Sequence, residues 1–407
     1  MTSGAPSALP DVFVTYGWCR VSYVILDSLA RHGVRVHVGD ASRLAMCRAS
    51  RRCASFTRTA HPYREPERYV EDVAAALTRT GARVLLPGHE DVLVLARYRN
   101  RLPAGTLLAA PDPDLLEAVR DKGRLAALAA RAGVTMPETW TPHDPAELRQ
   151  IASALHYPAV VKPRVGNSAK GITIVPDPAA CVAAVERLVA QHRLAPDRWP
   201  LIQAFAPGDG YGVCLLYDQG QLRAVSCERY LRAKDGDFGT SVLRESVHAP
   251  ALVEQARALL DPLGWHGVAR LDFLHDPATG RSALLEVNPR FWGALDLAVR
   301  AGVDFPWLLY RMLAEGGIEA REPAASYRAG VTSRWIVGEL LHGVNRLRRG
   351  QLGGAARWLA QVVGRRADGC DDLRWDDPLP LAAEMAYYGR RFLAAGSVNP
   401  VEEGMLG

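Results

Sequence analysis

Residues 267–293 read GVARLDFLHDPATGRSALLEVNPRFWG, and this stretch predicts a β-hairpin. Two strand-like runs rich in branched and aromatic residues flank the turn-forming cluster DPATG at 276–280. A turn centred on Thr279 places Asp272 opposite Glu286. Directly opposed residues of an antiparallel pair share one face of the sheet, with Cβ atoms about 5 Å apart. The hairpin should therefore have one polar, charged face and one apolar face.

The polar face has the composition of a magnesium site. The same register places Arg270 opposite Asn288, and Arg290 follows, so the face carries two carboxylates, a carboxamide and two guanidiniums. Mg²⁺ prefers oxygen ligands, commonly one or two carboxylates with substrate phosphates. Two opposed carboxylates repel each other unless a cation lies between them. We therefore predict Asp272, Glu286 and Asn288 as ligands of Mg²⁺, or of Mn²⁺ in its place; a solvated polar face is the alternative. The predicted apolar face consists of Leu271, Phe273, Leu285 and Val287.

A second candidate feature lies upstream of the hairpin. The apolar strand 159–162 ends at Lys162, and the glycine-containing loop GNSAKG follows at 166–171. Backbone N–H groups of such a loop can bind phosphate oxygens, and the lysine supplies a point charge. An ordinary turn after a strand is the alternative interpretation of this pattern.

Residues 270–290 resemble the metal-binding hairpin of the ATP-grasp superfamily, which includes D-alanine–D-alanine ligase, biotin carboxylase and carbamoyl phosphate synthetase. The resemblance implies a strand lysine, a mobile phosphate loop and a hinge for adenine, in that order along the chain. Lys162 and the loop 166–171 match the first two, and LIQAFAPGDG at 201–210 resembles the hinge. The segment RDKGR at 120–124 resembles the segment whose lysine reaches the nucleotide phosphates.

The resemblance implies ATP as the nucleotide, with contacts spread over these segments. Gln203 stands where the family more often has an acidic residue. The implied ATP contacts are Lys122, Lys162, Gly166, Ser168, Gly171, Gln203, Ala204, Phe205 and Asp209.

The fold class expected is α/β: an ATP-grasp fold with an N-terminal Rossmann-like domain and a helical C-terminal extension. Strands at 11–15, 34–38 and 83–87 alternate with helices at 21–31 and 67–80, a pattern typical of a parallel sheet. The predicted units are 1–120 (Rossmann-like domain), 121–195 (small lobe with Lys162 and the glycine loop), 196–320 (large lobe with the hairpin) and 321–407 (helical extension).

The extension should contain amphipathic helices at 334–347, 352–363 and 381–393. Its arginines are interpreted as a lid, a partner surface, an oligomer contact or simply a solvated helix face. They are Arg346, Arg348, Arg349, Arg357, Arg365 and Arg366.

Substrate contacts are expected at two further places. Glu90 follows the third predicted strand at its carboxyl end, where open α/β sheets bind ligands, and helix capping is its alternative role. The polar, glycine-containing segment 229–246 is predicted to be a mobile loop that closes over the substrate, with Ser241 and Arg244 as contacts.

The composition fits a cytoplasmic enzyme. The chain has 407 residues, 48% of them hydrophobic, and a formal net charge of +5 with basic and acidic residues interspersed, so we expect no nucleic-acid partner. The seven cysteines include no CxxC pair. The N-terminal residues lack the pattern of a signal peptide, and no run approaches ~18 apolar residues. We therefore expect no membrane partner, and we leave assembly as a homodimer open.

The resemblance implies an ATP-dependent ligase that joins a carboxylate to an amine through an acyl phosphate. Lys162, Lys122 and Mg²⁺ would neutralise the triphosphate, Arg270 would stabilise the tetrahedral oxyanion, and Arg290 would contact the substrate carboxylate. Three alternatives remain: a bicarbonate-using carboxylase or carbamoyl-phosphate-type enzyme, a thioester-forming ligase, and an ATP-binding regulatory module without turnover.

Overall fold

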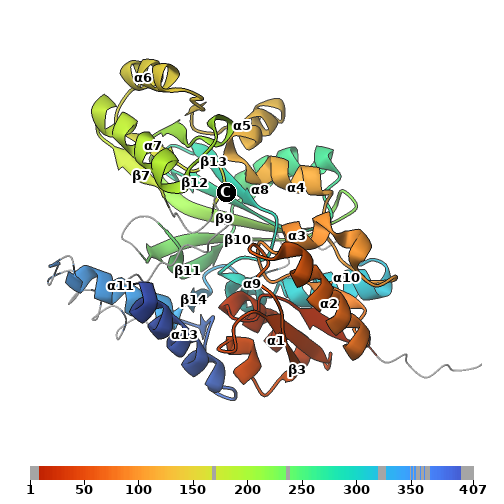
Figure 1. The fold of residues 1–407 in the computed structure, drawn as a ribbon. Coiled ribbons are helices and arrows are strands. Elements are labelled where there is room, and N and C mark those ends of the chain that lie inside the picture. The colour runs from red at the N-terminus through yellow and green to blue at the C-terminus, as the bar shows by residue number, and fades with distance from the viewer. Residues whose placement is uncertain are drawn as a thin grey trace, which may run out of the picture.

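The computed structural model describes residues 9–166, 171–234, 239–319, 327–348 and 367–395, together with the single positions 350, 351, 353, 358 and 362. Strands of these residues form three sheets (Figure 1). Short 3₁₀ helices occur at Met46–Ala49, Arg99–Arg101, Pro196–Arg198 and Asp261–Leu263. Among the described residues, no helix combines the length and the apolar character that crossing a bilayer requires.

The N-terminal lobe contains a four-stranded parallel sheet, which confirms the predicted alternation of strands and helices. Its strands, in the order β3-β2-β1-β4, are β1 (Val12–Val14), β2 (Val36–Asp40), β3 (Cys53–Arg58) and β4 (Val84–Leu86). Its helices are α1 (Arg20–Arg31), α2 (Pro66–Thr80) and α3 (Val92–Arg97). Strand β3 was not predicted, because its short CASFTR run lacks an apolar stretch and remains only partly buried at the edge of the sheet.

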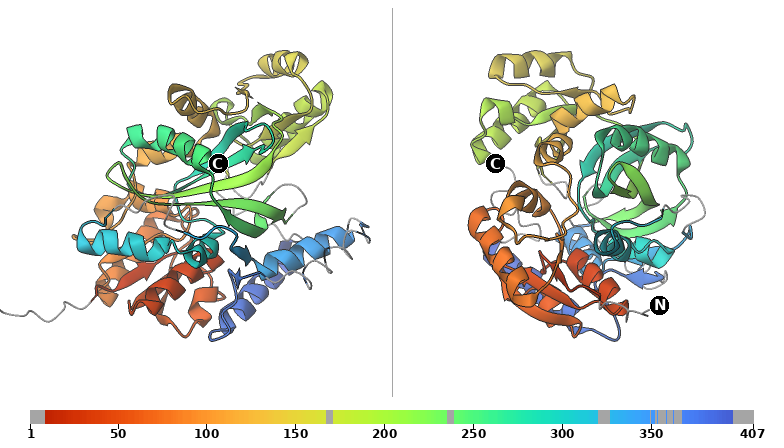
Figure 2. Two further views of the ribbon diagram at one scale, coloured as in Figure 1. Left: turned by 180° about the vertical axis from the view of Figure 1, so that it is seen from behind. Right: turned by 90° about the vertical axis from the view of Figure 1, so that its right-hand side faces the viewer.

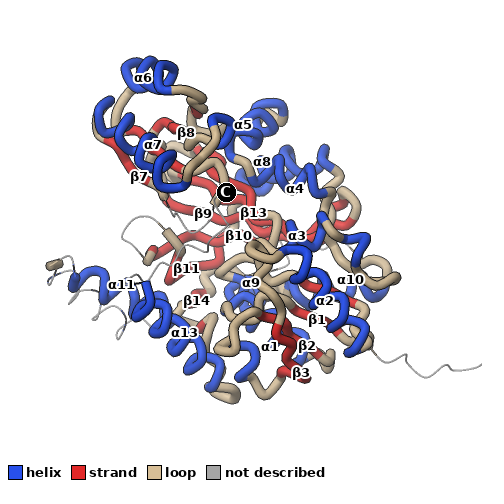
Figure 3. Tube along the Cα trace, in the orientation of Figure 1, coloured by secondary structure: helices blue, strands red, loops and turns tan. Residues whose placement is uncertain are grey.

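A second, smaller lobe has its own sheet and its own core. Its strands, in the order β5-β8-β6-β7, are β5 (Thr139–Trp140), β6 (Ala159–Lys162), β7 (Thr173–Val175) and β8 (Leu201–Ala204). Helices α6 (Pro145–Ala154) and α7 (Pro178–His192) cover one face of this sheet, and Leu148, Val161 and Val185 are among the residues of the shared core (Figure 3). Because β8 belongs to this sheet, we propose that the small lobe extends to residue 204 rather than 195.

The large lobe is built on a seven-stranded sheet in the order β13-β12-β9-β10-β11-β14-β15. The strands are β9 (Asp209–Asp218), β10 (Gln221–Ala233), β11 (Ser241–Val247), β12 (Gly267–His275), β13 (Ser282–Asn288), β14 (Thr332–Arg334) and β15 (Gly369–Cys370). The helices around it are α8 (Pro250–Leu260), α9 (Leu295–Ala301) and α10 (Phe305–Glu315).

The N-terminal and large lobes share their hydrophobic cores. One cluster joins Phe13 and Leu85 of the N-terminal sheet to Val213, Leu271 and Phe273 of the large sheet. Helices α4 (Pro113–Arg120) and α5 (Lys122–Arg131) lie against β13. Two further views show the small lobe standing apart from this combined body (Figure 2).

The C-terminal extension is not purely helical, since β14 and β15 extend the large sheet. Helices α11 (Ile336–Arg348) and α13 (Leu379–Ala395) agree with two predicted helices, and both figures show them side by side (Figures 1 and 2). Trp335, Leu341 and Tyr388 pack together between them. The predicted helix 352–363, apart from positions 353, 358 and 362, lies outside the described residues, as do four of the arginines: Arg349, Arg357, Arg365 and Arg366.

Candidate active site

The hairpin has the predicted register. Asp272 pairs with Glu286 and Arg270 with Asn288. A β-bulge follows, so that Phe273 pairs with Leu284, and the expectation that Leu285 faces the core is wrong. The extra residue of a bulge changes which side chains alternate inward, and Leu284 is buried in its place.

The two carboxylates converge on one point. The Asn288 Nδ2 atom donates hydrogen bonds to Asp272 Oδ2 (2.8 Å) and to Glu286 Oε1 (3.2 Å), so a single atom lies within reach of both. Burial raises the pKa of Asp272 to about 7 against the opposing effect of Arg270. Among the described residues, no three His, Cys, Asp or Glu side chains form a metal-binding group. The two carboxylates suit Mg²⁺. Asn288 turns its amide nitrogen toward them and its Oδ1 toward Arg290 in the structure, so Asn288 as a metal ligand stays a prediction that requires the amide to turn over.

Two lysines from different segments meet beside the hairpin. Lys122 begins α5, and its Nζ atom lies 3.3 Å from Glu286 Oε2 and 3.4 Å from the carbonyl oxygen of Gly166. Lys162 ends β6 and is buried, and burial together with the charge of Lys122 lowers its pKa to about 7. Burial raises the pKa of Glu286, but Lys122, the hydrogen bond from Asn288, Lys162 and Arg290 together outweigh burial and lower the pKa. The site therefore holds carboxylates on one side and two amines on the other.

Two residues that were not predicted, Glu228 and Tyr230, help to hold Arg270 and Asp272 in place. The Nη2 atom of Arg270 lies 2.8 Å from Glu228 Oε1 and 2.9 Å from Asp272 Oδ1. Tyr230 donates its hydroxyl proton to Asp272, and its ring lies under the Arg270 guanidinium. Glu228 and Tyr230 lie on β10, two strands away from β12. The sequence contains no local signal for this pairing, because it depends on the order of the strands.

Arg290 and Glu90 link the hairpin to the N-terminal lobe. Arg290 Nε donates to Glu90 Oε1 (2.9 Å), Nη2 to Asn288 Oδ1 (2.8 Å) and Nη1 to the Phe291 carbonyl (2.8 Å). Arg120 Nε donates to the other oxygen of Glu90 (3.1 Å). Glu90 is 4% exposed, and its contacts are ion pairs with arginines rather than a helix cap. Burial raises its pKa, but the two guanidiniums outweigh burial and hold the pKa well below its usual range.

In the hinge segment, the side chain of Gln203 makes a polar contact within the small sheet. Gln203 is buried, and its amide donates to Thr139 Oγ1 (2.9 Å). Phe205, by contrast, is 41% exposed. Val160 pairs with both Gln203 and Ile174, so the three side chains share one face of this sheet, opposite the helices. Ala204 and Asp209 flank this surface at the ends of β8 and β9.

The glycine loop is described only at its ends. Gly166 and Gly171 border it, and Ser168 lies outside the described residues. Gly171 has φ +74°, and a Cβ atom there would lie 2.9 Å from the Pro163 side chain. Glycine is therefore required where the loop rejoins β7.

The segment 229–246 is not the mobile loop that was predicted. Residues on both sides of 235–238 form β10 and β11, an antiparallel pair; 235–238 lie outside the described residues. The polar side chains that suggested a loop make cross-strand contacts, for example Arg229 to Glu245 at 2.8 Å. Ser241 donates to the Leu243 carbonyl (3.4 Å). Arg244 is 1% exposed and lies 2.7 Å from Asp371, which comes from the extension.

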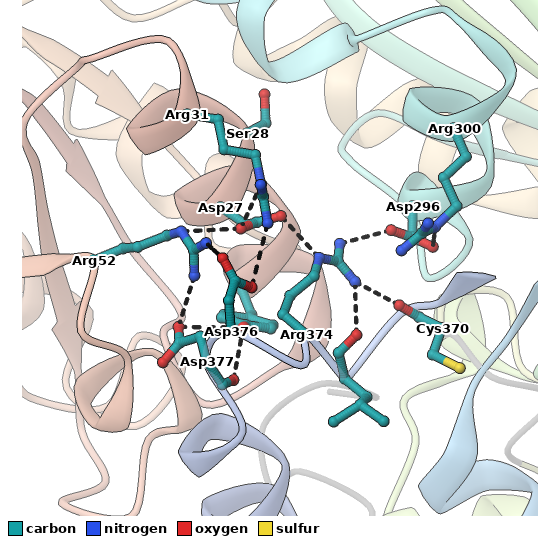
Figure 4. Close-up of polar contacts among 12 residues, drawn as sticks. Asp27, Ser28, Arg31, Arg52, Asp296, Arg300, Cys370, Arg374, Asp376 and Asp377 are labelled. Carbon is teal, nitrogen blue, oxygen red and sulfur yellow. Dashed lines mark hydrogen bonds and ion pairs between the residues drawn. The ribbon is translucent and has the colours of Figure 1, made fainter.

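The segment 371–377, DDLRWDD, was not predicted to have a role, and it joins the extension to the N-terminal lobe and to the large lobe. Arg374 Nε donates to Asp27 Oδ2 on α1 (2.8 Å), and Nη2 donates to Asp296 Oδ1 on α9 (2.6 Å), as Figure 4 shows. Arg52 approaches the other oxygen of Asp27 (3.1 Å). Four aspartates within seven residues were the available signal, but the partners of Arg374, Asp27 and Asp296, lie 347 and 78 positions away in the sequence.

The comparisons with known proteins agree with this geometry. Residues 200–337 match the family model described as ATP-grasp in the biosynthetic pathway with Ter operon. The mitochondrial methylcrotonoyl-CoA carboxylase subunit alpha of Oryza sativa subsp. japonica is 24% identical over 246 residues, which cover 56% of this chain and 32% of that protein. The chain thus spans about a third of the length of this relative.

Two solved structures have a similar fold. The biotin carboxylase domain of the 2-oxoglutarate carboxylase of Hydrogenobacter thermophilus, in complex with MgADP, ADP and bicarbonate, has a TM-score of 0.64 at 16% identity, over 79% of this chain and 73% of that one. The L-amino acid ligase of Bacillus licheniformis has a TM-score of 0.61 at 18% identity, over 79% and 78%. The chain has the ATP-grasp fold, which confirms the predicted fold class and the predicted resemblance.

Proposed function

We propose that the protein is an ATP-dependent ligase that activates a carboxylate as an acyl phosphate and joins it to an amine, with release of ADP and phosphate. The observation that carries this proposal is the convergence of Lys122 and Lys162 on Glu286, across from Asp272. These residues come from four separate segments of the sequence. Buried amines facing opposed carboxylates suit a polyphosphate with a divalent cation between them.

In this proposal each group of the hairpin has one role. Asp272, Glu286 and Asn288 hold Mg²⁺, or Mn²⁺ in its place. The cation, when bound, neutralises negative charge on the phosphate oxygens. Lys122 and Lys162 supply the remaining positive charge, and the backbone of the glycine loop covers the phosphates.

Adenine would occupy the open face of the small sheet. Val160, Ile174 and Phe205 offer apolar surface there, and Ile174 and Phe205 remain exposed. Flat aromatic groups are stabilised by burial against such side chains. The buried Gln203 amide donates to Thr139 in the structure, and we propose that the backbone at Ala204 to Ala206 makes the polar contacts with the base.

The reaction then follows from charge and position. A carboxylate oxygen of the substrate attacks the γ-phosphorus of ATP, and ADP leaves. The amine nitrogen next attacks the acyl carbon, and phosphate leaves with the oxygen that had attacked phosphorus. Arg270 suits the developing oxyanion, because its Nε atom is buried without a hydrogen-bond partner in the described part of the chain, while Nη2 is held by Glu228 and Asp272.

We propose a changed role for Arg290. Its three nitrogens already donate to Glu90, Asn288 and the Phe291 carbonyl. This guanidinium therefore suits the positioning of Asn288 better than direct capture of a substrate carboxylate. Contact with the substrate carboxylate, the role expected from the sequence, would require Arg290 to give up one of these hydrogen bonds.

A second candidate is a bicarbonate-using enzyme of the carboxylase type. The likeness to methylcrotonoyl-CoA carboxylase and to the biotin carboxylase domain favours it. Its first step uses the same groups, with bicarbonate as the carboxylate. ADP formation that depends on bicarbonate alone would distinguish this candidate from the ligase.

The direct test is an ADP-release screen with pooled carboxylates and pooled amines, followed by mass spectrometry of the product. The ligase proposal predicts ADP formation that requires one member of each pool and an amide product of the summed mass less water. Hydroxylamine in place of the amine should trap a hydroxamate. Release of AMP and pyrophosphate would contradict the proposal, and ADP formation that Asp272→Ala does not reduce would point to a contaminating ATPase.

A further inference from the structure

A buried guanidinium with unused donors lies at the junction of the N-terminal lobe, the large sheet and the C-terminal extension. Arg244 on β11 makes both of its described side-chain contacts through Nη2: to Asp371 Oδ2 (2.7 Å) and to the carbonyl oxygen of Gly293 (3.2 Å). Its Nε and Nη1 atoms are buried and have no hydrogen-bond partner among the described residues. Three N–H donors of this side chain are therefore unsatisfied, which is costly for a buried charged group.

A second guanidinium lies beside the first. Arg20 begins α1, and its Nε atom donates to the same two oxygens, Gly293 O (3.1 Å) and Asp371 Oδ2 (3.2 Å). The guanidinium carbon of Arg20 lies over the indole of Trp335, 3.8 Å from the ring centroid. Glycine at position 293 leaves room for this arrangement, because a Cβ atom there would lie 2.4 Å from Arg20 Nη2 and would displace the guanidinium. The guanidiniums of Arg20 and Arg244 therefore lie side by side on the same two oxygen atoms.

The charged groups around the pair leave the unused donors unsatisfied. Asp371 is shared by both arginines and also accepts from Ser333 Oγ (2.9 Å). Asp372 accepts from the backbone N–H groups of Ile336 and Val337 at the start of α11. Lys234 adds a further positive charge, 6.0 Å from the Trp335 ring, and Glu384 accepts from Trp335 Nε1 (3.1 Å).

The pair faces the reaction centre without being part of it. Arg244 pairs directly with Tyr230, so the two side chains share one face of the sheet, and the Tyr230 hydroxyl reaches Asp272. Three strand spacings separate β11 from β12, about 14 Å. The lysines that suit the triphosphate lie beyond β12, at Glu286 on β13. A group bound at Arg244 is therefore on the side of the substrate that lies away from the nucleotide.

We propose that Arg20 and Arg244 form a subsite for a substrate carboxylate that is not itself phosphorylated. A planar carboxylate offers two oxygens that match the fork of a guanidinium, and Arg20 adds a second positive charge. The carboxylate belongs either to the amine substrate, which is then an amino acid, or to the carboxylate substrate, which is then a dicarboxylate. This inference rests on the proposed ligase function and names the class of its substrates.

The test compares matched substrates in matched variants. One arm pairs the standard amino acids with the amines that lack the α-carboxylate, and the other pairs dicarboxylates of four to six carbons with monocarboxylates of the same length. The measured quantity is the ratio of kcat/KM within each pair, for the unmodified protein and for Arg244→Gln, Arg244→Lys and Arg20→Gln. Arg328→Gln is the control, because Arg328 is exposed and its side chain donates only to the Arg300 carbonyl among the described contacts.

We expect one arm to show a preference for the additional carboxylate of about tenfold or more, the scale of a hydrogen bond between charged groups. Arg244→Gln should bring that ratio close to one, Arg244→Lys should restore part of it, and the control should leave it unchanged. The inference is overturned if neither arm shows a preference, or if the preference survives in both Arg244→Gln and Arg20→Gln.

Binding separates failure of this inference from failure of the ligase proposal. If no pair releases ADP, the ligase proposal fails, and calorimetric titration of the same amino acids and dicarboxylates still tests the subsite. Binding that Arg244→Gln or Arg244→Lys weakens and Arg328→Gln does not would support it, provided that the variants keep the thermal transition of the unmodified protein. Absence of binding by all of these carboxylates would overturn it.

Discussion

Replacing Glu90 by glutamine separates two accounts of this residue. In the structure, Glu90 is a buried anion held between Arg290 and Arg120, and these arginines are the only described hydrogen-bond and ion-pair partners of its side chain. Glutamine keeps the size of the side chain and removes its charge. Two guanidiniums then lose the carboxylate that balances them at the contact between the hairpin, the N-terminal lobe and the segment before α5.

The expected loss of stability is large. Removing one partner of a buried ion pair typically costs about 3–5 kcal/mol, because the other charge stays buried without compensation. Glutamine still accepts one hydrogen bond, so we expect a loss near the lower end, about 3 kcal/mol. Glu117→Gln is the matched control, since Glu117 pairs with the exposed Arg97 at 3.4 Å. Such a surface pair is worth about 0–1 kcal/mol.

The assay is urea denaturation followed by tryptophan fluorescence, at pH 5 and pH 7. The pKa of Glu90 is lowered on folding, so its contribution is present above the unfolded value of about 4.3 and is lost as pH falls toward the folded value. The difference between Glu90→Gln and the unmodified protein should therefore be nearly equal at pH 5 and pH 7. A midpoint as little changed as that of Glu117→Gln, with a raised KM for one substrate, would refute this reasoning and restore the predicted substrate contact.

Three further predictions concern the reaction centre. Asp272→Ala or Glu286→Ala should abolish ADP formation while ATP binding stays measurable by titration, because each removes an oxygen from the cation; undiminished turnover in both would exclude the metal assignment. ATP binding at pH 8 should take up a proton, because Lys162 has a pKa of about 7 and bound phosphate raises that pKa. Calorimetry in buffers of different ionisation enthalpy measures the proton uptake, and zero uptake would contradict this prediction. Arg270→Lys should lower product formation about a hundredfold or more with little effect on ATP affinity, since lysine lacks the fixed fork; equal loss of both would exclude an oxyanion role.

Short-range features of the fold could be predicted from the sequence. The hairpin register follows from turn-forming residues and from alternation over a few positions, and the pairing of Asp272 with Glu286 is the one expected. The bulge that moves Leu285 out of the core has no such signal, because SALLEV contains two adjacent leucines of equal hydrophobicity. Strand β3 escaped prediction because an edge strand with small and polar residues lacks a distinctive pattern.

Long-range contacts could not be predicted, because each depends on where distant strands and helices meet. Arg290 and Glu90 are 200 positions apart, and Arg20 and Asp371 are 351 apart. Each side chain by itself looks like an ordinary charged residue. The same reason explains why Arg244 was assigned to a loop: a polar strand in the middle of a sheet looks like a loop until its buried partners are known.

The central claim is that the substrate carboxylate attacks phosphorus directly. Once the screen has identified the carboxylate, the enzyme should be supplied with that compound labelled with ¹⁸O in both carboxylate oxygens, together with ATP and the amine. The acyl-phosphate route predicts one ¹⁸O atom in each molecule of inorganic phosphate and the other in the amide product, as measured by mass spectrometry. Phosphate without ¹⁸O, or ¹⁸O found in AMP, would contradict the account.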